Sequence, residues 1–316
     1  MKSLRAVFFG TPEFAAASLK TIHESSHKIV GVVTVPDKAS GRGQKITESA
    51  VKKYAAQQQF PVFQPEKLRD SEFLDQMRKL DADVFVVVAF RMMPKVLFEL
   101  PRLGTFNLHA SLLPDYRGAA PINYAIINGE TKSGITTFFI NEKIDEGNIL
   151  LQHEVEINPE DNAGSLHDRL MEEGAQLVVQ TMDRLAEGNL TEQPQQEKKE
   201  VKNAFKIFKE DTRINWQQDA QTVHNFIRGL SPYPCAFTKL KIGGEEKTFK
   251  IFSGSTESTD SQEPAANLYV DRKNFKIMTG EGWYLPAEVQ LEGKKRMGIK
   301  DFLNGLGSYD NISLIQ

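Results

Sequence analysis

The chain has 316 residues, of which 40% are hydrophobic and 26% charged, and its formal net charge is −3. This length is sufficient for two domains that each bury a core, and the composition is ordinary for a water-soluble protein. No apolar run approaches the roughly 20 residues that cross a bilayer, and the single cysteine, Cys235, excludes an internal disulfide. We therefore expect a cytoplasmic protein without membrane association, whose apolar N-terminal run is a strand rather than a signal peptide.

Residues 1–188 alternate short apolar runs with helical patterns, which is typical of a parallel sheet covered on both faces. Strands are expected at 4–9, 29–35, 84–89, 103–109 and 134–140. Helices are expected from Pro12 onward, at 121–128 and at 163–186, the last ending at Gly188. The pattern predicts a Rossmann-like α/β domain and does not by itself identify a ligand.

Asn107 and His109 stand two residues apart at the end of the strand predicted over 103–109. Alternation puts both side chains on one face, at the sheet edge where ligands gather in open parallel sheets. Asp145 comes behind the next strand, in Ile-Asp-Glu-Gly. An Asn-x-His tripeptide alone is more typical of a turn amide and a structural histidine. The long motif at 111–122, Ser-Leu-Leu-Pro-Asp-Tyr-Arg-Gly-Ala-Ala-Pro-Ile, favours catalysis instead.

An amide, an imidazole and a carboxylate are suited to moving a one-carbon acyl group onto an amine. Such a transfer passes through a tetrahedral intermediate whose oxyanion needs hydrogen-bond donors placed in advance. We expect Asn107 and His109 to stabilise this oxyanion. Asp145 is expected to orient His109, stabilise its charged form and assist proton transfer.

The composition changes after residue 188. Residues 189–206 are polar and predict a linker, and residues 207–316 contain one helical stretch, 219–229, among short strands separated by Gly, Asn and Asp. These strands are expected at 236–242, 248–252, 267–270, 275–278 and 282–285. Many short strands with turn signals predict a small β-barrel as the second domain.

A basic segment follows the second strand. Residues 36–53 hold five basic residues against two acidic ones, a net charge of +3, around a Gly-Arg-Gly at 41–43. Alone, such a segment is more often a solvated surface than a nucleic-acid site, although a local basic patch can bind phosphate whatever the total charge.

The motif at 106–122, together with Asp145, resembles the active-site segment of the folate-dependent formyltransferase family. The resemblance implies 10-formyltetrahydrofolate as the one-carbon donor and no metal. It implies three catalytic residues, Asn107, His109 and Asp145. It also implies a folate site lined by Ser111, Leu112, Leu113 and Pro114, with backbone from 88–93 against the pterin ring. Arg91 departs from the family pattern, because relatives often carry glycine there.

Two further tracts resemble the tRNA-directed members of the family: Phe-Phe-Gly-Thr-Pro-Glu-Phe at 8–14 and Val-Pro-Asp-Lys-Ala-Ser-Gly-Arg-Gly-Gln-Lys-Ile at 35–46, which overlaps the basic segment. This resemblance implies that the acceptor is the α-amino group of methionyl initiator tRNA. It further implies that Arg42, supported by Lys38 and Lys45, contacts the acceptor stem. The second domain would then be a barrel of the oligonucleotide-binding type that holds the tRNA backbone. We expect a monomer.

Four alternatives remain open at this point. Formyltransferases that act on amino-sugar nucleotides share the catalytic trio, but tend to carry Arg-Gly-Arg-Ala-Pro where 117–121 reads Arg-Gly-Ala-Ala-Pro. A glycinamide formyltransferase would not need residues 207–316. A tRNA-binding protein that has lost catalysis would not need the intact trio. A formyltetrahydrofolate hydrolase would release formate without any acceptor.

Overall fold

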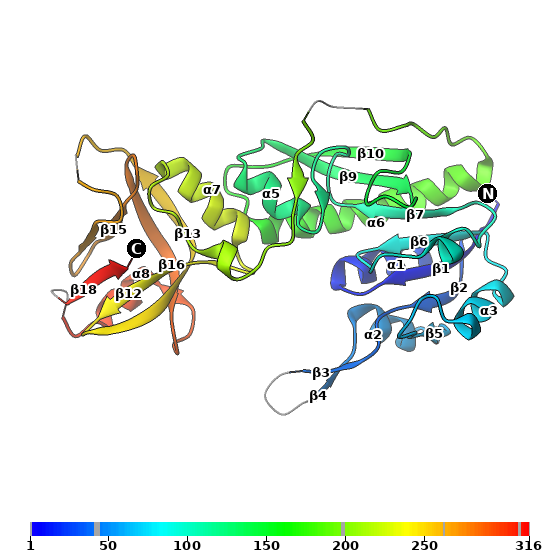
Figure 1. The fold of residues 1–316 in the computed structure, drawn as a ribbon, viewed down its shortest axis with the longest axis horizontal. Helices are drawn as coiled ribbons and strands as arrows, with labels where there is room; N and C mark the ends of the chain where they lie inside the picture. The colour runs from blue at the N-terminus through cyan, green and yellow to red at the C-terminus, as the bar shows by residue number, and fades with distance from the viewer. Residues whose placement is uncertain (1, 41–44, 197–199, 262, 309–310, 316) are drawn as a thin grey trace. The chain divides into compact units, whose positions relative to one another are not determined.

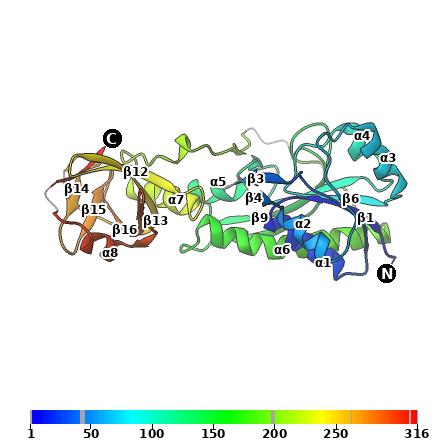
Figure 2. The ribbon, with the colours of Figure 1, turned by 90° about the horizontal axis from the view of Figure 1, so that it is seen from below.

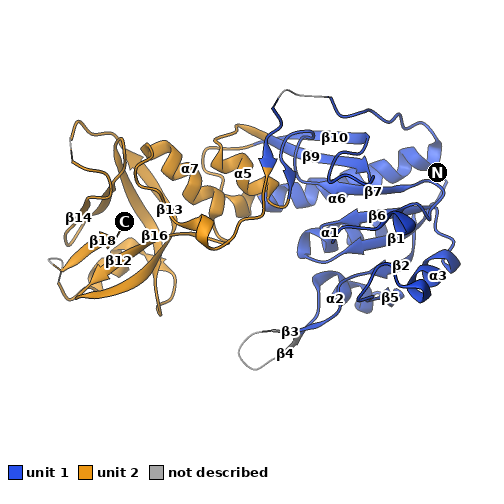
Figure 3. Ribbon diagram, in the orientation of Figure 1, with its two compact units in different colours: residues 1–118, 133–156, 167–203 blue, residues 119–132, 157–166, 204–316 orange. Residues whose placement is uncertain are grey.

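The computed structural model describes residues 2–40, 45–196, 200–261, 263–308 and 311–315, with backbone alone at 39–40 and 45–46. The chain packs as two compact units, neither of which is one continuous stretch (Figure 3). Unit 1 comprises residues 1–118, 133–156 and 167–203, and unit 2 comprises 119–132, 157–166 and 204–316. The bounds expected along the chain, 1–188, a linker at 189–206 and 207–316, stay a prediction.

Seven strands form the sheet of unit 1, in the order β10-β9-β7-β6-β1-β2-β5 (Figure 1). They are β1 (Arg5–Gly10), β2 (Lys28–Val33), β5 (Val62–Phe63), β6 (Val84–Val88), β7 (Thr105–His109), β9 (Lys132–Phe139) and β10 (Ile149–Glu156). From β5 through β2, β1 and β6 to β7 the strands are parallel, whereas β9 runs antiparallel to β7. The predicted Rossmann-like sheet is thus confirmed, with an antiparallel strand added beside β7.

Helices lie on both faces of this sheet, with α1 and α6 on one side and α3 and α4 on the other (Figure 2). The helices of unit 1 are α1 (Glu13–His23), α2 (Ala50–Gln57), α3 (Ser71–Lys79) and α4 (Lys95–Phe98), and α6 (Ala163–Glu187) belongs to it from residue 167 onward. The sequence pattern did not predict α2, α3 or α4. Two of them begin at side-chain caps, because Ser49 accepts from the Lys52 N–H and Asp70 from the Phe73 N–H.

A curled antiparallel sheet makes up most of unit 2, in the order β14-β15-β16-β13-β12-β18 with β17 beside β16. Its strands are β12 (Ala236–Ile242), β13 (Glu245–Glu257), β14 (Leu268–Val270), β15 (Phe275–Met278), β16 (Trp283–Leu291), β17 (Met297–Gly298) and β18 (Ile312–Ile315). The edge strands β14 and β18 approach each other, so the sheet nearly closes and the predicted barrel is confirmed.

The remaining elements are short or cover the barrel. They are β3 (Lys38–Ser40), β4 (Lys45–Thr47) and β8 (Arg117–Gly118) in unit 1, β11 (Asn203–Ala204) where the chain passes between units, and α5 (Pro121–Ile127), η1 (Glu210–Thr212), α7 (Ala220–Leu230) and α8 (Ile299–Asn304) in unit 2. Among the residues that the structure describes, no helix is both long and apolar enough to cross a membrane.

Aromatic side chains fill the barrel of unit 2. Phe249 packs against Phe275 and Phe302 with ring centroids 5.5 and 5.0 Å away. Trp216 is 4% exposed and its indole N–H donates to Thr238 Oγ1 at 3.2 Å. Trp216 is therefore part of the barrel core and is not available as a surface for stacking bases.

Helix α5 packs against α7 within unit 2, and Gly229 makes this contact possible. A Cβ added at Gly229 would lie 2.9 Å from the backbone nitrogen of Ile127 and 3.1 Å from the carbonyl oxygen of Asn123. The Asn123 side chain also donates to the Gly229 carbonyl at 2.8 Å. Both helices must therefore separate if the glycine gains a side chain.

We expect Gly229→Ala to lower the free energy of unfolding of unit 2 by about 1–3 kcal/mol, because the methyl group overpacks a backbone contact. Chemical denaturation followed by tryptophan fluorescence measures this, since both tryptophans lie in unit 2. Gly307→Ala is the matched control, because a Cβ at Gly307 meets nothing within 4 Å. Equal stability of the two variants would contradict the prediction.

Candidate active site

Asn107 and His109 lie on the face of the sheet that α3 and α4 cover. Asn107 pairs in register with Val87, which belongs to the apolar cluster beneath those two helices. Leu108 points to the opposite face, toward Gly174 of α6. The predicted strand alternation is therefore confirmed, and both polar side chains lie at the carboxyl end of β7.

The ring of His109 is held from two sides. Its Nε2 lies 2.8 Å from the Tyr116 carbonyl oxygen, and because a carbonyl can only accept, Nε2 carries the proton. Its Nδ1 lies 3.8 Å from Asp145 Oδ2, which is an electrostatic contact longer than a hydrogen bond. His109 is 6% exposed. Nδ1 is thus the ring atom left to exchange a proton, and it faces a carboxylate.

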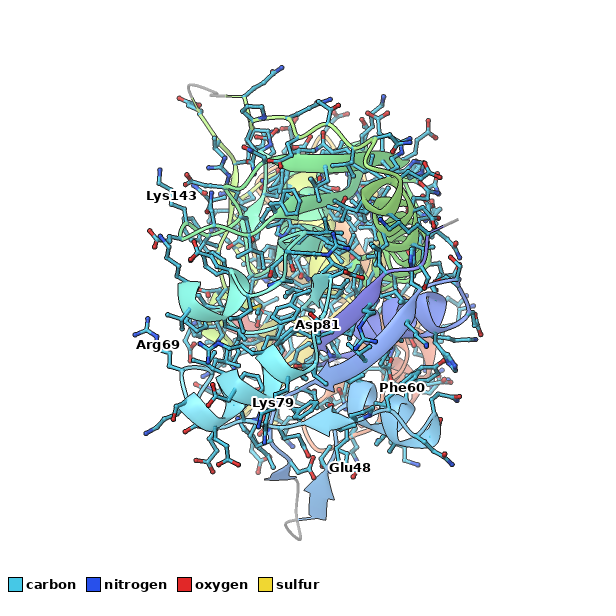
Figure 4. All side chains as sticks on the ribbon, turned by 90° about the vertical axis from the view of Figure 1, so that its right-hand side faces the viewer. Glu48, Phe60, Arg69, Lys79, Asp81 and Lys143 are labelled. Carbon is cyan, nitrogen blue, oxygen red and sulfur yellow. The ribbon has the colours of Figure 1, made fainter. Side chains whose placement is uncertain are left out.

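Asp145 lies in a tight loop between β9 and β10. Its φ is +54°, an unfavourable conformation for a residue with a side chain, and its Oδ2 accepts from the Gly118 N–H at 2.9 Å. Lys143 projects outward from the same loop (Figure 4). Gly147 closes the loop, because a Cβ there would lie 1.6 Å from the Phe139 carbonyl oxygen. The structure therefore brings together His109 and Asp145, as the sequence predicted.

Gln195 and Arg117 complete this cluster, and neither was predicted from the sequence as a site residue. The Gln195 side chain donates to the carbonyls of Asp145 at 2.7 Å and Gly147 at 2.9 Å, and accepts from Arg117 at 2.6 and 3.1 Å. Arg117 also pairs with Glu146 at 3.3 Å. Gln195 lies in the segment predicted as a linker, where no local pattern distinguished it from neighbouring glutamines.

The segment Ser111, Leu112, Leu113 and Pro114 is mostly packed inward. Ser111 donates to the Asp115 carbonyl at 2.7 Å, and Leu113 packs with Phe138 and Ile149. Its role in lining a folate site stays a prediction. Any contact with a ligand would come chiefly from its backbone and from the partly exposed Leu112.

Arg91 fixes the loop that follows β6. Its guanidinium donates to the carbonyls of Pro65 and Glu66, and burial lowers its pKa. The departure from glycine noted in the sequence therefore supplies a brace between two loops.

A cavity of about 590 Å³ lies beside Arg91 and is lined in part by Met92, which is 71% exposed. Basic residues gather in its lining, including Lys67, Arg69 and Lys95, and Arg69 projects outward (Figure 4).

The basic segment forms a β-hairpin. Strands β3 and β4 pair antiparallel, with Lys38 opposite Thr47, and project from the body of unit 1 (Figure 1). Lys38 is exposed, Lys45 begins β4 with its side chain not described, and Arg42 lies outside the described residues. At the hairpin base, near Glu48 (Figure 4), Lys52 pairs with Asp37 and with Glu48.

The ion pairs at the hairpin base engage both acidic residues of the segment and one of its five basic residues. Hydrogen bonds from Lys52 and Gln64 lower the pKa of the Asp37 carboxyl, and the same pairing with Asp37 raises the pKa of Lys52. Lys52 therefore has a structural role at the hairpin base, where its charge is met by two carboxylates.

Cys235 is buried in unit 2, and its thiol is a poor nucleophile. Burial raises the pKa of its thiol to about 11, so the thiolate is scarce at neutral pH. Within the described part of the chain, no group of three or more His, Cys, Asp or Glu side chains is arranged to hold a metal ion.

The fold and the site together define an α/β enzyme whose polar groups suit acyl transfer to an amine. The chain belongs to the formyl transferase family. The family model described as formyl transferase matches residues 4–182, and that described as formyl transferase, C-terminal domain, matches residues 206–307. The family expected from the motif is therefore confirmed.

Curated relatives match over almost the whole chain. A methionyl-tRNA formyltransferase of Flavobacterium johnsoniae is 48% identical over 97% of this chain and 97% of its own length. One of Flavobacterium psychrophilum is 46% identical over the same shares. An N-formyltransferase from Helicobacter canadensis, solved with folinic acid and dTDP-3-aminofucose, has a TM-score of 0.62 at 21% identity, over 90% of this chain and 99% of that one. This last likeness shows the fold alone.

We expect Gly147→Ala to reduce formyl transfer by about 10²-fold, because the loop must move away from Phe139 and misplace the Asp145 carboxylate. Steady-state kinetics measures the loss. Gly307→Ala is the matched control, because neither Gly147 nor Gly307 has a positive φ and a Cβ at Gly307 meets nothing within 4 Å. Equal activities of the two variants would contradict the prediction.

Proposed function

We propose that this enzyme transfers the formyl group of 10-formyltetrahydrofolate to the α-amino group of methionyl initiator tRNA. The main support for this acceptor is that the likeness to methionyl-tRNA formyltransferases extends through both units, over 97% of the chain. The buried His109–Asp145 contact at the carboxyl end of β7 supports the chemistry.

The reaction forms one C–N bond and breaks another. The neutral amine attacks the formyl carbon, the carbonyl oxygen becomes an oxyanion, and the bond to N10 of the folate then breaks. The Asn107 amide and His109, protonated at Nδ1, donate to the oxyanion. Asp145 stabilises the positive imidazole and, directly or through water, takes the proton that the amine loses. N10 receives a proton as it leaves, so the charge balances.

The hairpin and the second domain would hold the tRNA. Lys38 begins β3 and Lys45 begins β4, and Arg42 falls between them in the sequence; the three would neutralise phosphates of the acceptor stem. We assign catalysis to residues 1–188, the linker to 189–206 and tRNA binding to the barrel domain 207–316. In that barrel Arg296 already pairs with Glu288 and stacks over Phe252 at 4.1 Å.

The acceptor is tested by transfer of labelled formyl from 10-formyltetrahydrofolate to initiator methionyl-tRNA, elongator methionyl-tRNA or an amino-sugar nucleotide. We expect rapid labelling of the initiator tRNA alone. Labelling of the sugar, or release of formate without an acceptor, would overturn the tRNA assignment and leave the catalytic trio standing.

Arg42→Ala should raise KM for tRNA without changing the KM for folate, because it removes one phosphate or base contact.

Asn107 is tested separately. We expect Asn107→Ala to lower kcat by about 10²–10³, the usual effect of removing one oxyanion donor. KM for both substrates should change little, because the contact forms only in the transition state. Near-wild-type turnover in a variant that keeps its unfolding midpoint would refute this role.

A further inference from the structure

We propose that Gln195 is a positioning residue for the Asp145 carboxylate. It is the point where the polar segment after α6 joins the catalytic cluster, because its side-chain nitrogen reaches the carbonyls of Asp145 and Gly147. These two carbonyls flank Glu146, so one amide holds the loop on both sides of its turn. Since the role of Asp145 is itself proposed, this inference rests on the proposed function.

The loop needs such a hold because Asp145 adopts a positive φ. A residue with a side chain keeps this conformation only when its surroundings impose it. Gly147 permits the chain to pass close to Phe139, but a residue without a side chain does not hold the loop in this conformation. Two hydrogen bonds from a half-buried amide supply a fixed reference for the backbone on either side of the carboxylate-bearing turn.

Arg117 determines which way the Gln195 amide points. A guanidinium can only donate, so the amide oxygen must face Arg117, and it accepts from Nε and Nη2 there. The amide NH2 is thereby directed at the two carbonyls, which can only accept. A glutamine satisfies every partner in this arrangement, whereas a glutamate would place an oxygen against both carbonyls.

Gln195 holds the backbone beside Asp145, whereas the carboxylate itself accepts a hydrogen bond at Oδ2 from the N–H of Gly118, the residue after Arg117. The distance from Asp145 Oδ2 to His109 Nδ1, 3.8 Å, is therefore set by both the loop backbone and the 117–118 strand. If Gln195 is lost, the backbone anchor goes while the Gly118 bond remains. We expect the carboxylate to stay in the site with its direction toward His109 disturbed.

We expect Gln195→Ala to lower kcat about ten- to a hundredfold, with KM for tRNA and for folate changed less than twofold and the unfolding midpoint unchanged. Gln195→Glu should lose at least as much, although it still accepts from Arg117. Gln196→Ala is the matched control, being the exposed neighbour of the same residue type, and should keep full activity. The inference would be overturned if the two alanine variants were equally active, or if Gln195→Ala raised KM and left kcat unchanged.

A double-mutant cycle with Asp145→Asn separates this inference from the proposed function. In single-turnover assays, Asp145→Asn should lower the rate, and adding Gln195→Ala should lower it no further, because the group being positioned is already gone. If the two losses multiply, Gln195 acts independently of Asp145 and the inference fails alone. If Asp145→Asn keeps full activity, the proposed role of Asp145 fails, and the role of Gln195 fails with it.

Discussion

The carbonyl oxygen of Tyr116 determines how the site can work, because it accepts a hydrogen bond from the Nε2–H of His109 and leaves Nδ1 to face Asp145. That carbonyl is itself fixed. Tyr116 is 6% exposed, has a φ of +60°, and donates its N–H to the Lys202 carbonyl. One backbone group thus orients the imidazole, and the chain must pass residue 116 in an unusual conformation for this to happen.

Guanidinium groups recur as braces around the same edge of the sheet. Arg91 joins the loop after β6 to the carbonyls of Pro65 and Glu66, and Arg117 orients the amide of Gln195. In both cases the guanidinium N–H groups donate to carbonyl or amide oxygens, and these oxygens can only accept. The loops that carry the polar site residues are therefore held by directional contacts, while the strands beneath them are held by apolar packing.

The sequence predicted what depends on local pattern. Strand alternation placed Asn107 and His109 on one face, and the carboxyl-end rule for parallel sheets placed them at the site edge. It predicted the contacts of neither Gln195 nor Arg91, because their partners lie 25 to 78 residues away along the chain and no periodicity reports such contacts. The packing of α5 with α7 could not be predicted from the sequence either. It depends on Gly229, whose missing side chain matters only because α5, distant in the sequence, packs against it.

The burial of Cys235 has a practical consequence. It is the only cysteine in the chain, and with its thiol inside unit 2 and its pKa near 11 it offers little to a thiol-reactive dye at neutral pH. The native protein is therefore already a clean background for site-directed labelling. A single cysteine introduced at the exposed position of Lys38 would carry a fluorophore on the β3–β4 hairpin, and its emission would report the approach of a nucleic acid to that hairpin in real time.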